Sequence, residues 1–108
     1  MKSFKQKVAV ITGAGSGMGR YLAVLLAKDG ADVCVCDVNE ETLSDTLAML
    51  RKFNVSVSSH IVDVSDKEAI EALPQKVIDQ HGKVDMVFNN AGVTAGSHFR
   101  DMKEDNRD

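Results

Sequence analysis

A glycine-rich segment, from Thr12 to Gly19, joins an apolar run to an amphipathic stretch. The run Val8–Thr12 is short, rich in β-branched residues and followed by glycine, as expected of a strand buried on both faces of a parallel sheet. Over residues 18–29 apolar side chains recur at helical spacing, and Gly30 can supply a left-handed cap. Because parallel strands are joined through helices, this strand-to-helix segment predicts an α/β fold.

The strand and helix pattern repeats along the chain up to residue 88. Further strands are predicted at residues 31–37, 55–62 and 84–88, and further helices at residues 39–53 and 65–82. Asn39 is a suitable N-cap for the second helix, and the Ser65–Glu68 sequence fits a capping box at the start of the third. Pro74 lies inside that third helix, where proline removes a hydrogen bond, so we expect a kink or two short helical pieces.

The connections between these elements determine the order of the strands. Right-handed crossovers carry the first three strands outward in one direction, with two helices on one face. The third helix must cross to the opposite face if the fourth strand pairs on the other side of the first. The prediction is a doubly wound, Rossmann-like parallel sheet of order 3-2-1-4, a partial Rossmann fold. Its switch point lies between the first and fourth strands, beside the turns at residues 13–19 and 89–92.

The glycines of the first turn favour a site for a negatively charged ligand. Gly13 allows a sharp exit from the strand, and Gly17 and Gly19 allow backbone to approach a ligand and the helix to pack on the sheet. The free N–H groups of Gly17, Met18 and Gly19, at the positive end of the helix dipole, can bind a pyrophosphate. Met18 breaks the strict Gly-x-Gly-x-x-Gly spacing and no P-loop lysine follows, so a glycine-rich turn without a ligand is the alternative.

Asp37 ends the second predicted strand, where a carboxylate can accept hydrogen bonds from both hydroxyls of an adenosine ribose. A 2′-phosphate on that ribose would need a basic neighbour, but Ser16 and Val38 are not basic, and Glu40 and Glu41 are acidic. These residues therefore favour NAD over NADP. The alternative is a surface aspartate that begins a turn.

Two further segments belong to the same predicted edge of the sheet. Asp63 can accept a hydrogen bond from an adenine amino group while the Val64 backbone lines the base, although an aspartate before a helix is also a common turn former. Asn89 and Gly92 belong to the sequence Asn-Asn-Ala-Gly. They can tie the fourth strand to its neighbours or allow close approach of a cofactor, so a structural role and a binding role both remain open.

Together these motifs resemble the short-chain dehydrogenase/reductase family. The matching residues are Thr12-Gly13-x-x-x-Gly17-x-Gly19, Asp37, the pair Asp63-Val64, and Asn89-Asn90-Ala91-Gly92. The match runs from residue 7 to about residue 94, and we take residues 1–94 as the cofactor-binding half-domain. The resemblance implies that NAD is held by Gly13, Ser16, Gly17, Met18, Gly19, Asp37, Val38, Asp63, Val64, Asn90, Ala91 and Gly92.

The resemblance also implies which chemical groups are missing. The family transfers hydride at a carbonyl with a Tyr-x-x-x-Lys pair, a serine and a further asparagine, all beyond the Asn-Asn-Ala-Gly motif, and this sequence ends before them. Tyr21, the single tyrosine, has Leu25 four residues later in place of a lysine, so we expect it to be a packing residue. We therefore name no catalytic residue and expect no turnover from these 108 residues alone.

The histidines and cysteines do not form a recognisable site in the sequence. His60, His81 and His98 fall on separate elements without metal-ligand spacing, so we interpret them as solvated or capping groups and expect no metal. Cys34 and Cys36 are one residue apart, a spacing that suits neither zinc nor a redox pair. On a strand both side chains point to one face, and we expect them to act as small hydrophobic residues.

Composition limits the partners of the chain. The 13 basic and 16 acidic residues give a net charge of −3 without a basic cluster, so neither nucleic acid nor an anionic membrane is expected as a partner. No apolar run is long enough for a secretion signal or a membrane span, so the cytoplasm is the expected compartment. Residues 95–108 hold seven charged residues among fourteen and are expected to be a flexible or weakly helical tail.

Three functional hypotheses follow. The first is the NAD(H)-binding N-terminal portion of an oxidoreductase that acts on a small alcohol or carbonyl substrate by hydride transfer in a full-length form. The second is a non-catalytic dinucleotide-binding or interaction module that pairs with another chain or with itself through the open edge of the fourth strand. The third is an incomplete reading frame without independent function.

Overall fold

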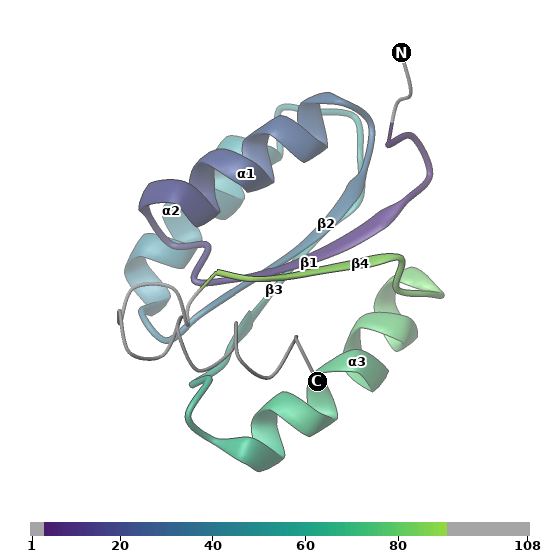
Figure 1. Cartoon of the computed structure of the whole chain (residues 1–108). Helices are drawn as coiled ribbons and strands as arrows, with labels where there is room; N and C mark the ends of the chain where they lie inside the picture. The colour runs from purple at the N-terminus through teal and green to yellow at the C-terminus, as the bar shows by residue number, and fades with distance from the viewer. Residues whose placement is uncertain (1–3, 91–108) are drawn as a thin grey trace, which may run out of the picture.

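The computed structural model describes residues 4–90 as one sheet flanked by helices (Figure 1). The elements in chain order are β1 (Val8–Thr12), α1 (Gly17–Lys28), β2 (Asp32–Asp37), α2 (Glu40–Leu50), β3 (Val57–Ile61), α3 (Lys67–His81) and β4 (Met86–Asn89). Every predicted helix and strand is present, with ends shifted by a few residues. The predictions for Ala91, Gly92, His98 and the tail at residues 95–108 lie outside the described residues.

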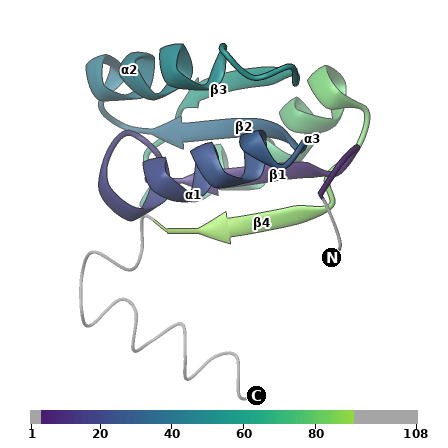
Figure 2. The same cartoon turned by 90° about the horizontal axis from the view of Figure 1, so that it is seen from above.

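The four strands form a parallel sheet of order β3-β2-β1-β4, which confirms the predicted topology. β1 lies at the centre, where Val10 is in register with Cys34 of β2 and Val87 of β4. Figure 1 shows α1 and α2 on one face of the sheet and α3 on the other, and Figure 2 shows β3 and β4 at opposite edges. The chain thus crosses to the other face of the sheet after β3, and this crossing produces the doubly wound arrangement.

Each face of the sheet carries its own apolar core. On the side of α1 and α2 the core includes Ile11 and Val33, while on the side of α3 it includes Val10 and Val77. Cys34 and Cys36 are both fully buried under α3 and unpaired by disulfide, so their predicted role as small hydrophobic residues is confirmed. A hydrogen bond with the neighbouring thiol, together with burial, raises the pKa of Cys36 far above the ordinary thiol range.

The start of α3 differs from the predicted capping box. Asp66, not Ser65, is the N-cap, and its Oδ1 accepts hydrogen bonds from the backbone N–H groups of Glu68 at 3.1 Å and Ala69 at 3.3 Å. Ser65 instead donates its backbone N–H and its hydroxyl to Asp63 Oδ1. The prediction was wrong because a carboxylate can accept two N–H groups at once, while the serine hydroxyl is used by the preceding turn.

Pro74 lies within one continuous helix, Lys67–His81, and the expected division into two short pieces is wrong. Leu73 and Val77, on either side of the proline, are both buried in the core under the sheet. This packing holds the turn before and the turn after Pro74 in place, so the helix tolerates the lost backbone hydrogen bond.

Two side chains occupy environments that the sequence did not predict. Tyr21 is 61% exposed on α1, so its expected packing role is wrong: α1 buries the face that carries Ala23, Leu26 and Ala27, and Tyr21 is not part of it. His81, expected to be solvated or to cap a helix, is half-buried, and its Nε2 lies 2.7 Å from Ser58 Oγ on β3. Burial lowers the pKa of His81 below its ordinary value.

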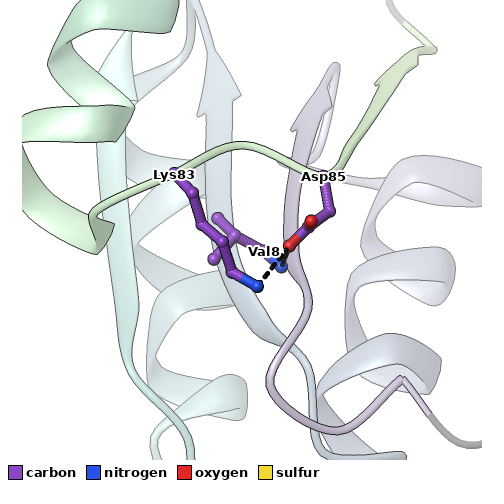
Figure 3. Close-up of polar contacts among 3 residues, drawn as sticks. All are labelled: Val8, Lys83 and Asp85. Atoms are coloured by element: carbon purple, nitrogen blue, oxygen red, sulfur yellow. Dashed lines mark hydrogen bonds and ion pairs between the residues drawn. The ribbon is translucent and has the colours of Figure 1, made fainter.

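Asp85 links the start of β4 to the start of β1 by hydrogen bonds (Figure 3). Its Oδ2 accepts a hydrogen bond of 2.8 Å from Val8 N and lies 3.1 Å from Lys83 Nζ. The backbone N–H of Asp85 returns a bond to the Val8 carbonyl. The bond from Val8 N, aided by Lys83, lowers the pKa of the Asp85 carboxyl below its ordinary value.

Asp85→Asn is expected to weaken the acid sensitivity of the fold. A carboxyl whose pKa is lowered by folding stabilises the native state above its unfolded pKa, and this contribution disappears as the pH falls through the folded pKa. Urea unfolding of the parent chain should therefore show stability falling below about pH 4, and the variant should show a shallower fall. Asp45→Asn, on the exposed side of α2, is the matched control. Identical acid profiles for Asp85→Asn and the parent would contradict the prediction.

Candidate functional site

A cleft of about 540 Å³ opens where the carboxyl ends of the strands meet. Its volume is within the range of small-molecule and cofactor sites. Nine of the twelve predicted site residues line it, together with Val62: Gly13, Ser16, Gly17, Met18, Asp37, Val38, Asp63, Val64 and Asn90. Of the other three, Gly19 is not among the lining residues, and Ala91 and Gly92 are outside the described residues. Residues from all four strand ends thus share one cavity at the switch point.

The glycine-rich loop presents the beginning of α1 to this cleft. Gly13 and Gly17 both have positive φ, +66° and +58°, so the chain leaves β1 and enters α1 through left-handed backbone that favours glycine. Ser16 is the N-cap, but its side chain makes no capping hydrogen bond, and the first turn contains no acidic residue. The backbone N–H groups of the first turn and the positive end of the helix dipole are therefore suited to an anion.

Gly19 allows α1 to pack directly on the loop. A Cβ at this position would lie 2.2 Å from the carbonyl oxygen of Gly13 and 2.9 Å from Nδ2 of Asn90. Asn90 Nδ2 itself donates to the Gly13 carbonyl at 3.3 Å. Gly19 thus contributes close packing of helix against loop, which is one of the two roles that the sequence predicted for it.

The end of β4 is tied to β1 by side chains of the Asn-Asn pair. Thr12 Oγ1 donates to Asn89 Oδ1 at 2.8 Å, and Asn90 reaches the Gly13 carbonyl. Asn89 therefore has the structural role that the sequence left open, while Asn90 combines a structural bond with a place in the cleft lining.

Asp37 presents its carboxylate at the end of β2, and three backbone N–H groups hold it. Oδ2 accepts from Gly15 N at 2.8 Å, while Oδ1 accepts from Val38 N at 2.7 Å and from Asn39 N at 3.2 Å. The carboxylate is thus fixed beside the glycine-rich loop. A carboxylate in this fixed position can accept further hydrogen bonds from hydroxyl groups of a ligand.

Asp63 serves the turn before α3 and also lines the cleft. Its Oδ1 accepts from the hydroxyl of Ser65 at 2.7 Å and from the Ser65 backbone N–H at 2.9 Å. These bonds lower the pKa of Asp63 below its ordinary value. The turn-forming role, which the sequence left as the alternative, is therefore present together with the cleft position.

Sequence reasoning missed the residues that support the cleft from behind. Arg20 on α1 and Thr46 on α2 donate hydrogen bonds to carbonyl oxygens of the glycine-rich loop. Arg20 itself was the available signal in the sequence. A cation in the first turn of a helix is repelled by the positive end of the helix dipole, so other contacts must stabilise it at that position. Within residues 4–90 there is no cluster of metal-ligating side chains and no helix long and apolar enough to span a membrane.

A parallel sheet of order β3-β2-β1-β4, with a glycine-rich turn after β1 and a carboxylate at the end of β2, defines the Rossmann class of dinucleotide-binding folds. The family model described as short chain dehydrogenase matches residues 7–108. The chain belongs to this family and corresponds to the N-terminal part of its members.

Relatives and solved structures agree with this membership. The chain is 39% identical over 98 residues to a probable oxidoreductase, EphD, of Mycobacterium tuberculosis, covering 91% of this chain and 17% of that protein. It is 33% identical over 102 residues to the 3-oxoacyl-[acyl-carrier-protein] reductase of Thermotoga maritima, covering 94% of this chain and 42% of the reductase. The structure of NAD⁺-bound xylitol dehydrogenase superposes with a TM-score of 0.81 and 37% identity, over 84% of this chain and 35% of that one. The chain thus spans less than half of the length of these relatives.

Proposed function

We propose that this chain binds NAD in the cleft and supplies the cofactor-binding part of an oxidoreductase that acts on an alcohol/carbonyl pair. The observation that carries the proposal is that two groups line the same cleft. The uncapped first turn of α1 is suited to a pyrophosphate, and the fixed Asp37 carboxylate is suited to a ribose. A solved relative, xylitol dehydrogenase, is described as NAD⁺-bound. NAD supplies a hydride acceptor or donor; the residues of this chain bind and orient it.

The residues present fit such a cofactor. A Cβ at Gly17 would meet nothing within 4 Å, so the loop is open to a ligand at the start of α1. The first-turn N–H groups, with Ser16 and Met18 beside them, would hold the pyrophosphate, and Asp37 would hold the adenosine ribose. Asp63 and Val64 would flank the adenine, while Asn90 would lie towards the central region of the dinucleotide.

The surroundings of Asp37 support NAD rather than NADP. A 2′-phosphate would approach the Asp37 carboxylate and need a cation to offset the repulsion. The neighbouring cleft residues Ser16 and Val38 carry no charge. The nearby guanidinium of Arg20 is occupied by the carbonyl oxygens of Gly15 and Thr42.

Calorimetric titration of the 108-residue chain tests this proposal. We expect ADP-ribose to bind about as well as NAD, since the residues of the cleft belong to the adenosine and pyrophosphate side of the site. We expect NADP to bind at least about tenfold more weakly than NAD, because its 2′-phosphate would make one unfavourable charge contact with the Asp37 carboxylate. No hydride transfer is expected from this chain alone. A folded sample that binds no adenosine ligand would contradict the proposal, and equal affinity for NAD and NADP would contradict the role given to Asp37.

In this proposal, the groups that bind the substrate and catalyse the reaction belong to a longer form of the protein. The small alcohol or carbonyl substrate is inferred from the family, and no described side chain takes the part of a proton donor beside it. Tyr21 is on the exposed side of α1 and does not line the cleft. The cytoplasm remains our proposed compartment, and the two free thiols are compatible with its reducing conditions.

A second candidate function, self-association, is favoured by the exposed edge of the sheet. Within the described residues β4 pairs with β1 alone, and Val87 at its centre is 64% exposed. An unpaired strand edge with an exposed apolar side chain can add another strand. Light scattering over a range of concentrations tests this candidate: growth of dimers or larger species supports it, and a monomer at every concentration contradicts it.

A further inference from the structure

Arg20 connects α1, α2 and the glycine-rich loop from behind the cleft. Its Nη2 donates to the carbonyl oxygens of Gly15 and of Thr42, the latter at 3.0 Å, and its Nε donates to Thr46 Oγ1 at 2.8 Å. Among the described residues the guanidinium forms no ion pair. All its partners are neutral oxygens, and these bonds offset the unfavourable position of a cation in the first turn of a helix.

Thr46 continues this connection on α2. The side chain is fully buried, and its Oγ1 lies 2.8 Å from the Ala14 carbonyl oxygen and 3.3 Å from that of Gly15. A hydroxyl has a single proton to donate. Because Thr46 Oγ1 accepts from Arg20, its own proton is available for the nearest acceptor, Ala14 O. Two consecutive carbonyl groups of the loop are therefore held by Arg20 and Thr46.

The peptide group between Ala14 and Gly15 is hydrogen-bonded at both its carbonyl and its N–H, and the N–H contacts Asp37. Its carbonyl accepts from Thr46, and its N–H, that of Gly15, donates to Asp37 Oδ2 at 2.8 Å. A peptide group is planar, so fixing the direction of the carbonyl also fixes the direction of the N–H. The bonds behind the loop thereby fix the direction of the Gly15 N–H, one of the three backbone N–H groups that hold the Asp37 carboxylate and the one that comes from the loop.

The packing around Gly15 makes this arrangement tight. A Cβ on Gly15 would lie 2.5 Å from Thr42 Oγ1 and 2.8 Å from Asp37 Oδ2. Both distances are shorter than a van der Waals contact, so the loop approaches Asp37 and α2 as closely as a residue without a side chain allows. A small rotation of this peptide would therefore displace the carboxylate.

We infer that Arg20 and Thr46 are positioning residues that set the ribose specificity of the site by fixing Asp37 through the Ala14–Gly15 peptide. The inference rests on the proposed function, because it needs the adenosine ribose to bind at Asp37. Neither side chain lines the cleft, so neither is expected to contact the ligand. Their substitution should remove the recognition of the ribose hydroxyl while leaving the phosphate contacts at the start of α1 in place.

The test compares ADP with 2′-deoxy-ADP by calorimetry on the 108-residue chain. The parent chain should prefer ADP by about tenfold, the range of one hydrogen bond to a charged group. In Thr46→Val and in Arg20→Met this preference should fall to about twofold or less, as expected when the acceptor is no longer held in place. Thr46→Ser, which keeps the hydroxyl, should restore it. Arg51→Met, at the exposed end of α2, is the matched control for loss of an arginine.

The outcomes separate this inference from the proposed function. A folded parent chain that binds neither nucleotide contradicts the proposed function. A parent that prefers ADP, with variants that weaken both nucleotides by the same factor, overturns the inference, because a purely structural role would leave the preference unchanged. Circular dichroism checks folding, and Arg20→Lys, which keeps the charge and the aliphatic stem, replaces Arg20→Met if the latter unfolds. A parent that binds both nucleotides equally also overturns the inference.

Discussion

Gly19→Ala is expected to destabilise the chain by about 3 kcal/mol, the upper part of the range for overpacking. The added Cβ would lie 2.2 Å from the Gly13 carbonyl oxygen, and this contact is between two backbone segments rather than with the end of a flexible side chain. To relieve it, α1 must move away from the loop, which also disturbs the bond from Asn90 to Gly13. Urea unfolding followed by circular dichroism measures the change.

Gly17→Ala, two residues earlier in the same segment, is the matched control. A Cβ at Gly17 meets nothing within 4 Å, but the residue has a φ of +58°. The expected loss is therefore about 1 kcal/mol, from the left-handed conformation alone. Equal losses for the two variants would show that the close approach of a Cβ at Gly19 to the Gly13 carbonyl adds no cost, and would contradict the prediction.

The sequence was sufficient to predict the fold because each part of the pattern acts locally. The β-branched run Val8–Thr12 is buried along its whole length, as predicted for a central parallel strand. The glycine turn and the handedness of the crossovers then restrict the strand order. The placing of Asp37 beside the loop followed in the same way, because parallel strands end at the same edge of the sheet.

The features that were missed depend on contacts between distant segments. Pro74 is tolerated because the residues on either side of it are buried against the sheet, and His81 is half-buried because it meets Ser58 on β3. Two of the three hydrogen-bond partners of Arg20, Thr42 and Thr46, lie on α2, more than twenty residues away. Local propensity contains none of this information. The sequence therefore predicts the lining of the cleft better than the bonds that hold the lining in place.

Asp37→Asn is expected to weaken the binding of NAD by about tenfold to a hundredfold, the range for hydrogen bonds to a charged acceptor. The asparagine side chain has one acceptor oxygen, whereas the two oxygens of Asp37 accept from backbone N–H groups on opposite sides, Gly15 N and Val38 N. The amide NH₂ must face one of these donors, so the loop or the side chain has to move. The same change removes the negative charge that opposes a 2′-phosphate, so the affinity for NADP should fall less than that for NAD.

Asp63→Asn is the control that separates this effect from a general loss of charge in the cleft. Asp63 also lines the cleft, but its Oδ1 is bonded to Ser65 in the turn before α3. Asp63 is proposed to flank the adenine, so its substitution should also weaken NAD, but by about threefold at most, because an asparagine oxygen can still accept from Ser65 and hold the turn in place. Parallel titrations of both variants with NAD and NADP measure the difference. If the two variants lose affinity equally, the loss is not specific to Asp37. If Asp37→Asn weakens NAD and NADP by the same factor, the Asp37 charge does not discriminate between them. Either result would contradict the recognition of the ribose by the Asp37 carboxylate.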